Sequence, residues 1–369
     1  MKKELLILLF IIPLVFFYVF SHSMKYVKQN SIPEVRMEDS FEVLQGCGTD
    51  DWSYVQTKCD YDDLDRYCTL YKKNFSHQFN SSPIFKIPQT VHLIWIGPKP
   101  FPPESVENIR TWMAHHPDWT FNFWTDRTRL VPCERMQLRL LEDFEFEFLK
   151  EKYEESKNWG EKSDIWRYEI LHAEGGVYID HDAKCLRPFH GLHTGYDFYA
   201  CLEMPHEEID AHALTVGIGI IGAKPKHPAI QGAIQTVLNR WDLVTATFST
   251  TDPFTQARRV AHRSYIALTY ALKEHLNLHE NTDIIFPACY FYPKHGLTGF
   301  YSVHLYETSW HNLYVSPNER FFHQMLRHLR DRDAKIIRVE LMSLFAMIGC
   351  FIVYLLVSKE LKSQSKSRR

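Results

Sequence analysis

Two carboxylates, Asp180 and Asp182, flank His181 directly after the apolar stretch 177–179. If that stretch is a buried strand, both acids lie where ligands bind in open α/β sheets, beyond the carboxyl ends of the strands. Two carboxylates this close offer oxygen ligands to Mg²⁺ or Mn²⁺, and nucleotide phosphates often complete the coordination shell. A single Asp-x-Asp triplet is also common in solvated turns, so its surroundings must decide between the two interpretations.

Those surroundings match a known pattern over residues 163–182, which read SDIWRYEILHAEGGVYIDHD. The segment resembles the sugar-nucleotide-binding signature of family 32 glycosyltransferases, roughly S-D-x-x-R-Y-x-x-L followed by G-G-x-Y-x-D-x-D. Every defining position is present. The resemblance covers about residues 87–311, and its weaker parts are the segments 87–95, 115–126, 223–228 and 303–310.

The resemblance implies a GT-A-like α/β fold, a nucleotide-diphosphate-sugar donor, and Mn²⁺ or Mg²⁺ as cofactor. Asp180 and Asp182 would handle the metal and the donor, and His304 would be a third metal ligand. The chain has 20 histidines, so a structural role for His304 is the alternative. Members of the family retain the anomeric configuration, and the leaving diphosphate could itself deprotonate the acceptor. We therefore name no general base.

Further donor contacts follow from the resemblance, and each has a structural alternative. Asp164 and Arg167 lie three residues apart on one helix face, where they can also form a plain salt bridge. An aromatic ring at a strand end can stack on a base or simply pack in the core. The implied donor-binding side chains are Trp95, Asp164, Arg167, Tyr178, Ser309 and Trp310.

The elements that must position these residues alternate between strand and helix. Apolar stretches bounded by Gly and Pro predict strands at 90–96, 121–124, 177–179, 198–202, 217–223 and 283–286. Helical patterns predict helices at 104–115, 134–157 and 163–173, the last capped by Ser163. Such alternation is typical of a mostly parallel sheet covered by helices. We therefore expect one catalytic domain over residues 87–335.

The chain departs from the family pattern in two places. Gly217-Ile218-Gly219 stands where an Asn is frequent, and Thr251-Asp252-Pro253 stands where T-G-P is common. These regions usually approach donor or acceptor, so the differences bear on the substrate more than on the fold.

Both ends of the chain are apolar. Residues 5–20 and 341–357 carry no charge, and the tail 358–369 is basic. We expect two transmembrane spans, with residues 1–4 and 358–369 cytosolic by the positive-inside rule. A cleaved signal peptide or a buried helix is the alternative for the first run, and a core helix for the second.

Residues 21–86 are polar with little periodicity, which suggests a lumenal stem. This stretch holds two glycosylation sequons, at Asn74 and Asn80, and three clustered cysteines, Cys47, Cys59 and Cys68. In a lumenal compartment we expect one disulfide among the cysteines, with a pairing that the sequence leaves open.

The charge balance, 42 basic against 45 acidic residues, gives no sign of nucleic-acid binding. The two-span layout resembles fungal inositol-phosphoceramide mannosyltransferases, which implies mannosyl transfer from GDP-mannose to a membrane lipid in the Golgi. A Golgi mannosyl- or galactosyltransferase acting on a glycan is the nearest alternative. Two non-enzymatic alternatives also stay open: a sugar-nucleotide-binding or regulatory subunit, and a membrane scaffold with a glycan-binding domain.

Overall fold

The computed structural model describes residues 35–79, 82–206, 212–250, 253–293, 299–307 and Gly349. Within these residues no helix is both long and apolar enough to cross a bilayer. The apolar runs 5–20 and 341–357 and both chain ends lie outside the described residues, apart from Gly349. The two membrane spans and the cytosolic ends therefore stay predictions.

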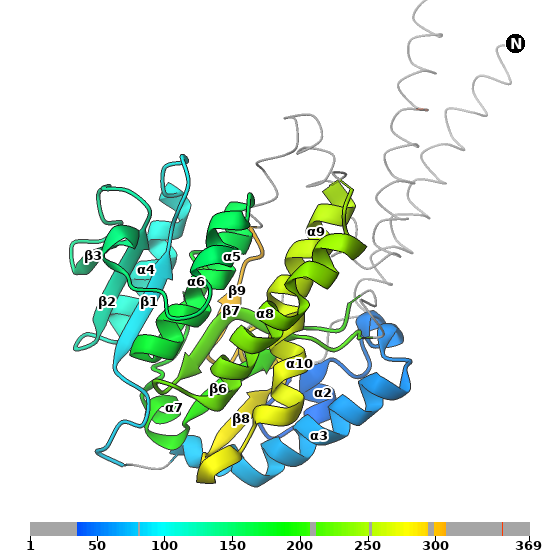
Figure 1. The fold of residues 1–369 in the computed structure, drawn as a ribbon. Coiled ribbons are helices and arrows are strands. Elements are labelled where there is room, and N and C mark those ends of the chain that lie inside the picture. The colour runs from blue at the N-terminus through cyan, green and yellow to red at the C-terminus, as the bar shows by residue number, and fades with distance from the viewer. Residues whose placement is uncertain are drawn as a thin grey trace, which may run out of the picture. The chain divides into compact units, whose positions relative to one another are not determined.

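The described part is built on a seven-stranded sheet in the order β3-β2-β1-β4-β7-β6-β8 (Figure 1). The strands are β1 (Thr90–Ile94), β2 (Thr120–Thr125), β3 (Met136–Leu140), β4 (Gly176–Ile179), β6 (Phe198–Leu202), β7 (Val216–Ala223) and β8 (Asp283–Phe286). Only β7 runs antiparallel to its two neighbours, and the other neighbouring pairs are parallel. The prediction of a mostly parallel α/β sheet is confirmed.

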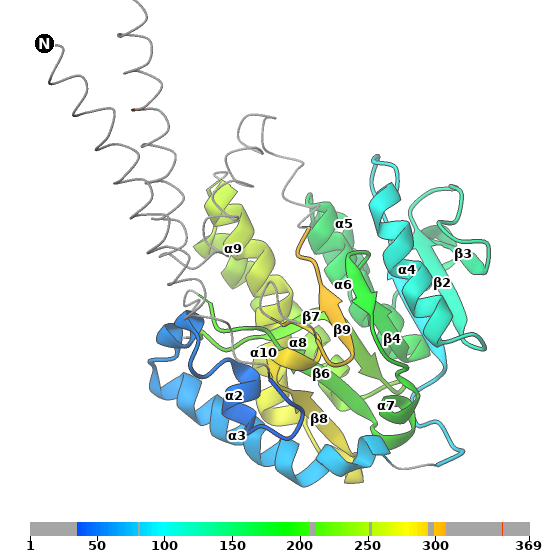
Figure 2. The ribbon, with the colours of Figure 1, turned by 180° about the vertical axis from the view of Figure 1, so that it is seen from behind.

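Helices cover both faces of the sheet. The helices at the front of Figure 1 are α5 (Lys150–Glu155), α6 (Trp159–Glu174), α8 (Pro228–Thr247), α9 (Pro253–Arg263) and α10 (Tyr265–His275). The opposite face, at the front of Figure 2, carries α4 (Pro103–His115), α7 (His190–Gly195) and a small antiparallel sheet of β5 (Ala183–Cys185) and β9 (Ser302–His304). Short 3-10 turns are found at Asp50–Tyr54, Phe75–Phe79, Leu141–Asp143, Leu278–Glu280 and Ala288–Tyr290.

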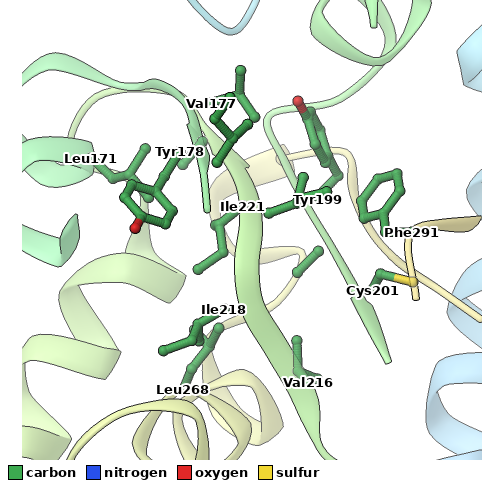
Figure 3. Close-up of a cluster of buried hydrophobic side chains, with 14 of the residues drawn as sticks. Leu171, Val177, Tyr178, Tyr199, Cys201, Val216, Ile218, Ile221, Leu268 and Phe291 are labelled. Atoms are coloured by element: carbon green, nitrogen blue, oxygen red, sulfur yellow. The ribbon is translucent and has the colours of Figure 1, made fainter. Parts of the chain in front are cut away.

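The core lies on both sides of β7, whose eight residues are all buried. Val216, Ile218 and Ile221 project from this strand among side chains of β4, β6 and α10 (Figure 3). A strand buried on both faces reads as a continuous apolar run rather than an alternating one. That is why its sequence, VGIGIIGA, predicts a strand despite three glycines.

Two helix predictions need correction. Residues 134–157 are not one helix, because Met136–Leu140 form edge strand β3 beside β2 and only Lys150–Glu155 are α-helical. Helix α6 begins at Trp159, not Ser163, since the side chain of Asn158 accepts a hydrogen bond from the backbone N–H of Glu161. An Asn at this position caps the first turn by filling an otherwise unpaired donor.

The expectation of a stem is wrong for residues 35–79. They form α2 (Phe41–Gln45) and α3 (Lys58–Asn74), and α3 packs beside β8 at the end of the sheet. Their apolar side chains belong to the same core as the strands: Phe41, Leu44, Leu64, Tyr67, Leu70 and Tyr71 are buried. The hydroxyl groups of Tyr71 and Tyr290 are 2.7 Å apart. The folded domain therefore begins well before residue 87.

The first predicted glycosylation site is also wrong. Asn74 is the last residue of α3, only 4% of its surface is exposed, and its amide donates a 2.7 Å hydrogen bond to the carbonyl of Asp283. An amide that is buried and donating in this way is not available to carry a glycan. Asn80, the second predicted site, lies outside the described residues.

The expected disulfide is absent from the described part of the chain. All seven cysteines described there carry free thiols, including Cys47, Cys59 and Cys68. This part of the protein is stabilised by its core rather than by a cross-link.

Buried His92 ties the helix–strand turn before the Asp-x-Asp triplet to β1. Its Nε2–H donates to the carbonyl of Gly175 at 2.8 Å, and its Nδ1 accepts from the indole of Trp124 at 3.0 Å. Gly175 and Gly176 both have positive φ, 65° and 98°, which glycine adopts without strain. A Cβ on Gly176 would lie 2.6 Å from the carbonyl of Thr90.

Because of His92, we expect the protein to lose stability in acid. Burial lowers the pKa of His92 to about 4 from its ordinary 6.5. The contribution of His92 to the free energy of unfolding is complete above pH 6.5 and is lost as the pH falls to 4. The reason is that only the unfolded state takes up the proton between these two pH values. The loss is about 3 kcal/mol. Guanidinium unfolding of the wild type and His92→Gln at pH 4 to 8 measures it. We expect the free energy of unfolding to change less with pH in the variant than in the wild type. An equal pH dependence in both proteins would contradict the assignment.

Candidate active site

The carboxyl ends of β1, β2 and β4 meet at one edge of the sheet, because these strands are parallel neighbours. Trp95 follows β1 and Asp180 follows β4, and the backbone N–H of Asp180 donates to the carbonyl of Gly219 at 2.7 Å. The loop after β1 is held in place by Asp126 at the end of β2, which accepts from the N–H of Gly97 at 3.2 Å. The predicted metal and base-stacking residues thus share one edge.

His304 reaches this edge through the pairing of β5 with β9. The register pairs Ala183, the residue after Asp182, directly with His304. Two backbone N–H groups strengthen the junction: Leu305 donates to the Asp182 carbonyl at 3.0 Å and Glu307 donates to its carboxylate at 2.7 Å. A residue remote in sequence is thereby fixed next to both aspartates.

Asp180, Asp182 and His304 together form a cluster that fits a divalent cation. The Nε2 of His304 lies 3.2 Å from Asp180 Oδ2 and 3.4 Å from Asp182 Oδ1, and the three candidate ligand atoms lie within 4.8 Å of one another. Two carboxylates and one imidazole are ligands that suit Mn²⁺ or Mg²⁺. The donor set therefore fits the predicted cofactor.

The charges in this cluster depend on one another. Burial opposes a proton on His304, but Asp182 and Asp180 outweigh it and raise the pKa of the imidazole to about 9. Burial also opposes ionisation of Asp180, yet the Arg167 guanidinium and His304 hold the pKa of its carboxyl well below the usual range. Without a metal ion, a protonated His304 would balance the charge of the two carboxylates, whereas a metal ion would bind the neutral ring.

Arg167 on α6 connects this cluster to Asp164. Its guanidinium lies 2.6 Å from Asp164 Oδ1 and 3.3 Å from Asp180 Oδ1, and it donates to the Ile218 carbonyl at 2.6 Å. The side chain is 4% exposed, and its cation lies 4.0 Å from the ring centre of Tyr178. Salt bridge and stacking occur together here, so Arg167 acts by holding its neighbours in place.

Tyr178 and Asp164 both contact that guanidinium. The hydroxyl of Tyr178 donates to Asp180 Oδ1 at 2.8 Å, and burial raises its pKa well above the ordinary value. Burial likewise raises the pKa of Asp164 to about 7, against the opposite effect of Arg167. The Asp164 side chain keeps 13% exposure, so it remains able to exchange hydrogen bonds with a ligand.

Gly219 on β7 is a site residue whose role the sequence did not reveal. A Cβ at this position would lie 2.8 Å from both Asp180 Oδ2 and His304 Nε2, which is closer than real Cβ atoms approach. The departure from the family pattern at residues 217–219 thus has a local reason. Any side chain at 219 would enter the space where the proposed ligands meet.

A cavity of about 230 Å³ lies next to the aspartates, lined by Trp95, Lys99, Pro100, Pro102, Glu104, His181 and Glu307. The indole N–H of Trp95 donates to the Lys99 carbonyl at 3.0 Å, and its ring packs edge-on against His181 at 5.0 Å. Of the lining residues, only Trp95 was singled out from the sequence. In the sequence, residues 97–103 appear only as the Gly and Pro residues that bound the strand predicted at 90–96, although their place after that strand is a usable signal. Ser309 and Trp310 lie outside the described residues.

A family model described as a glycosyltransferase sugar-binding region containing a DXD motif matches residues 102–199. That range includes α6, β4 and both aspartates of the triplet. Over these residues the chain is similar to the DXD-containing glycosyltransferases. The family resemblance carried by residues 163–182 is therefore confirmed.

Relatives of this DXD protein include a viral and a fungal sequence. An uncharacterized glycosyltransferase, L373, of Acanthamoeba polyphaga mimivirus is 31% identical over 146 residues, which is 38% of this chain and 52% of that protein. Inositol phosphoceramide mannosyltransferase 1 of Schizosaccharomyces pombe is 28% identical over 155 residues, 41% of this chain and 43% of that protein. The chain spans about half the length, or less, of the curated relatives that it matches.

Among solved structures, a chain titled PaToxG Glycosyltransferase aligns with 58% of this DXD protein and 79% of itself, at 14% identity and a TM-score of 0.39. This likeness is distant. The fold assignment rests on the strand order and directions described above.

Proposed function

We propose that the protein is a metal-dependent glycosyltransferase with a nucleotide-diphosphate-sugar donor. The observation that carries the proposal is the cluster of Asp180, Asp182 and His304 at the carboxyl edge of the sheet, beside a cavity lined by Trp95. Oxygen ligands for a cation next to an aromatic-lined cavity suit a nucleotide, whose diphosphate needs charge neutralisation and whose base has a flat face.

The three clustered side chains would hold Mn²⁺ or Mg²⁺, which when bound offsets the charge that develops on a departing diphosphate. Trp95 would contact the nucleotide base. Asp164 would exchange hydrogen bonds with donor-sugar hydroxyls, and Arg167, which is 4% exposed, would act through Asp164 and Asp180 rather than touch the donor. The protein's contribution is then to position the groups and to fix their charges before reaction.

For the substrates, we propose mannosyl transfer from GDP-mannose to inositol phosphoceramide, with retention of the anomeric configuration. Support comes from the names of four relatives at 25% to 29% identity, two called inositol phosphoceramide mannosyltransferases and two called mannosyl phosphorylinositol ceramide synthases. A lipid acceptor also agrees with the two apolar runs predicted to span a membrane, and we propose a Golgi location on the same grounds.

The test is a donor screen with the full-length protein and inositol phosphoceramide vesicles. GDP-mannose, UDP-glucose and UDP-galactose are supplied in turn, with Mn²⁺ or with EDTA, and nucleotide release and lipid mass are followed. We expect GDP release and a lipid heavier by one hexose, only with Mn²⁺. Release of UDP alone would overturn the donor assignment, and no Mn²⁺-dependent turnover with any donor would overturn the enzyme proposal.

A separate prediction concerns Trp95. Replacing the indole by Leu keeps an apolar side chain but removes the aromatic face, and stacking on a base contributes about 1–3 kcal/mol. We therefore expect Trp95→Leu to weaken GDP binding by about 5- to 150-fold. Trp95→Phe is the matched control and should stay within about threefold, since a flat ring remains. Calorimetric titration measures both, and equal weakening in the two variants would mean that Trp95 only packs.

A further inference from the structure

A second cluster of ligand-type side chains lies on α3, at the end of the sheet that carries β8. It consists of Cys59 and Asp63, one turn apart on α3, and His212, which precedes β7. We propose that these three side chains form a Zn²⁺ site, separate from the DXD cluster, that links α3 to the start of β7.

The spacing of the three ligand-type atoms is close to the spacing around one tetrahedral zinc ion. With zinc bonds of about 2.3 Å to sulfur and about 2.0–2.2 Å to nitrogen and oxygen, tetrahedral ligand atoms lie about 3.5 Å (S to N), 3.3 Å (N to O) and 3.6 Å (S to O) apart. In the structure Cys59 Sγ lies 3.6 Å from His212 Nδ1, 3.8 Å from Nε2 of the same ring and 3.9 Å from Asp63 Oδ2, and Nδ1 lies 3.3 Å from Oδ2. Because Sγ is almost equally far from both ring nitrogens, the imidazole must turn for Nδ1 to face a zinc ion that Cys59 also binds. All three edges agree within about 0.3 Å.

The supports around the cluster hold the ligands in this arrangement. Asp60, in the first turn of α3, accepts from the backbone N–H groups of Ala213 and Leu214 at 2.7 and 3.3 Å, which fixes the backbone next to His212. The imidazole packs edge-on against Tyr270 at 5.3 Å. Asp63 and His212 are each 3% exposed in their side chains. Ligands oriented by neighbours in this way are typical of metal sites.

Lys273 of α10 occupies a fourth position around the cluster. Its ammonium lies 3.0 Å from Asp63 Oδ2 and 3.3 Å from Cys59 Sγ. Although burial opposes ionisation of Asp63, hydrogen bonds from His212 and Lys273 lower the pKa of its carboxyl. The lysine side chain is 23% exposed and can therefore move into solvent when a metal brings its own charge. In this interpretation the Lys273 ammonium balances the negative charge of the cluster when no zinc is bound.

The two clusters differ in the metal that they favour. Cys59 contributes a soft thiolate and His212 an imidazole, a combination that suits Zn²⁺, whereas the oxygen-rich DXD cluster suits Mn²⁺ or Mg²⁺. Three protein ligands leave one position for water. Bound zinc would join α3 and the start of β7, two segments distant in sequence, and stabilise the folded state by binding to it alone.

The experiment uses the full-length protein, loaded with Zn²⁺, passed through a desalting column and analysed for metal. We expect about one zinc per chain for the wild type and for Cys47→Ser, which removes an exposed thiol outside the cluster. Cys59→Ser should hold less than about a tenth of that amount, because one of three ligands is lost. Co²⁺ in place of zinc should give the wild type a thiolate-to-metal absorption band that Cys59→Ser lacks.

Two further variants keep the test decisive. Asp180→Asn should retain the zinc, so failure of the DXD proposal and failure of this one can be told apart. Lys273→Met should bind zinc at least about tenfold more tightly, since the competing ammonium is gone. If the wild type and Lys273→Met both hold less than a tenth of a zinc per chain, or if Cys59→Ser keeps its zinc, the cluster is a hydrogen-bonded ion pair only and the proposal is overturned.

Discussion

Asp182→Asn is expected to lower the rate of sugar transfer on the order of 10³-fold, and Asp180→Asn by a similar factor. A bound cation contributes several kcal/mol to the stabilisation of the departing diphosphate, and about 1.4 kcal/mol corresponds to each factor of ten in rate. Asparagine keeps the size of the side chain but removes the charge that a hard cation requires. Initial rates at fixed Mn²⁺ concentration measure the effect.

Asp118→Asn is the matched control, because this exposed acid lies between α4 and β2, away from the cluster. It should leave the rate within about twofold and the stability within about 0.5 kcal/mol. Excess Mn²⁺ should restore part of the activity of Asp182→Asn if the loss is one of metal affinity. Full activity of either cluster variant, without added metal, would contradict the assignment of these aspartates.

Arg167→Met is expected to have the second-largest effect, on stability as well as on activity. The substitution leaves the carboxylates of Asp164 and Asp180 without the guanidinium that lies 2.6 and 3.3 Å away. Removing one partner from a buried ion pair costs about 3–5 kcal/mol, and the partial exposure of Asp180 favours the lower figure. Guanidinium unfolding gives the loss of stability, and the donor assay should show no turnover.

Two further variants separate the effect of Arg167→Met on stability from its effect on activity. Arg110→Met removes a cation from an exposed pair with Glu107 and should cost less than about 1 kcal/mol. The double variant Asp164→Leu with Arg167→Met should regain part of the stability, because apolar replacements of a buried pair are often tolerated, yet remain inactive. A single variant as stable as the wild type would show that Arg167 balances no buried charge.

The central strands were predictable because burial on both faces gives them continuous apolar sequences. The predicted ranges 198–202 and 283–286 coincide with β6 and β8. Edge strand β3 was missed, since its five residues, MQLRL, are partly exposed and lie in a stretch rich in Leu, Glu and Lys. There the alternation of Met136, Leu138 and Leu140 was the better signal.

The site was predictable where its residues are contiguous and unpredictable where the fold assembles it. Residues 163–182 carry a recognisable pattern, whereas the closeness of Gly219 to His304 depends on the order of strands in the sheet. The misjudged stem has a different cause. Helix α3 is rich in charged and tyrosine residues, yet two of its tyrosines, Tyr67 and Tyr71, are buried in the core, and the Tyr71 hydroxyl lies 2.7 Å from that of Tyr290.

The pairing of β5 with β9 has a consequence for biosynthesis. Asp180 and Asp182 leave the ribosome more than a hundred residues before His304, and the chain must return across that interval before the third candidate ligand reaches them. A nascent or truncated chain ending before β9 would hold the aspartates but lack the strand that completes the cluster. Binding of a metal ion by all three candidate ligands would therefore have to wait until β9 has been synthesised and has paired with β5.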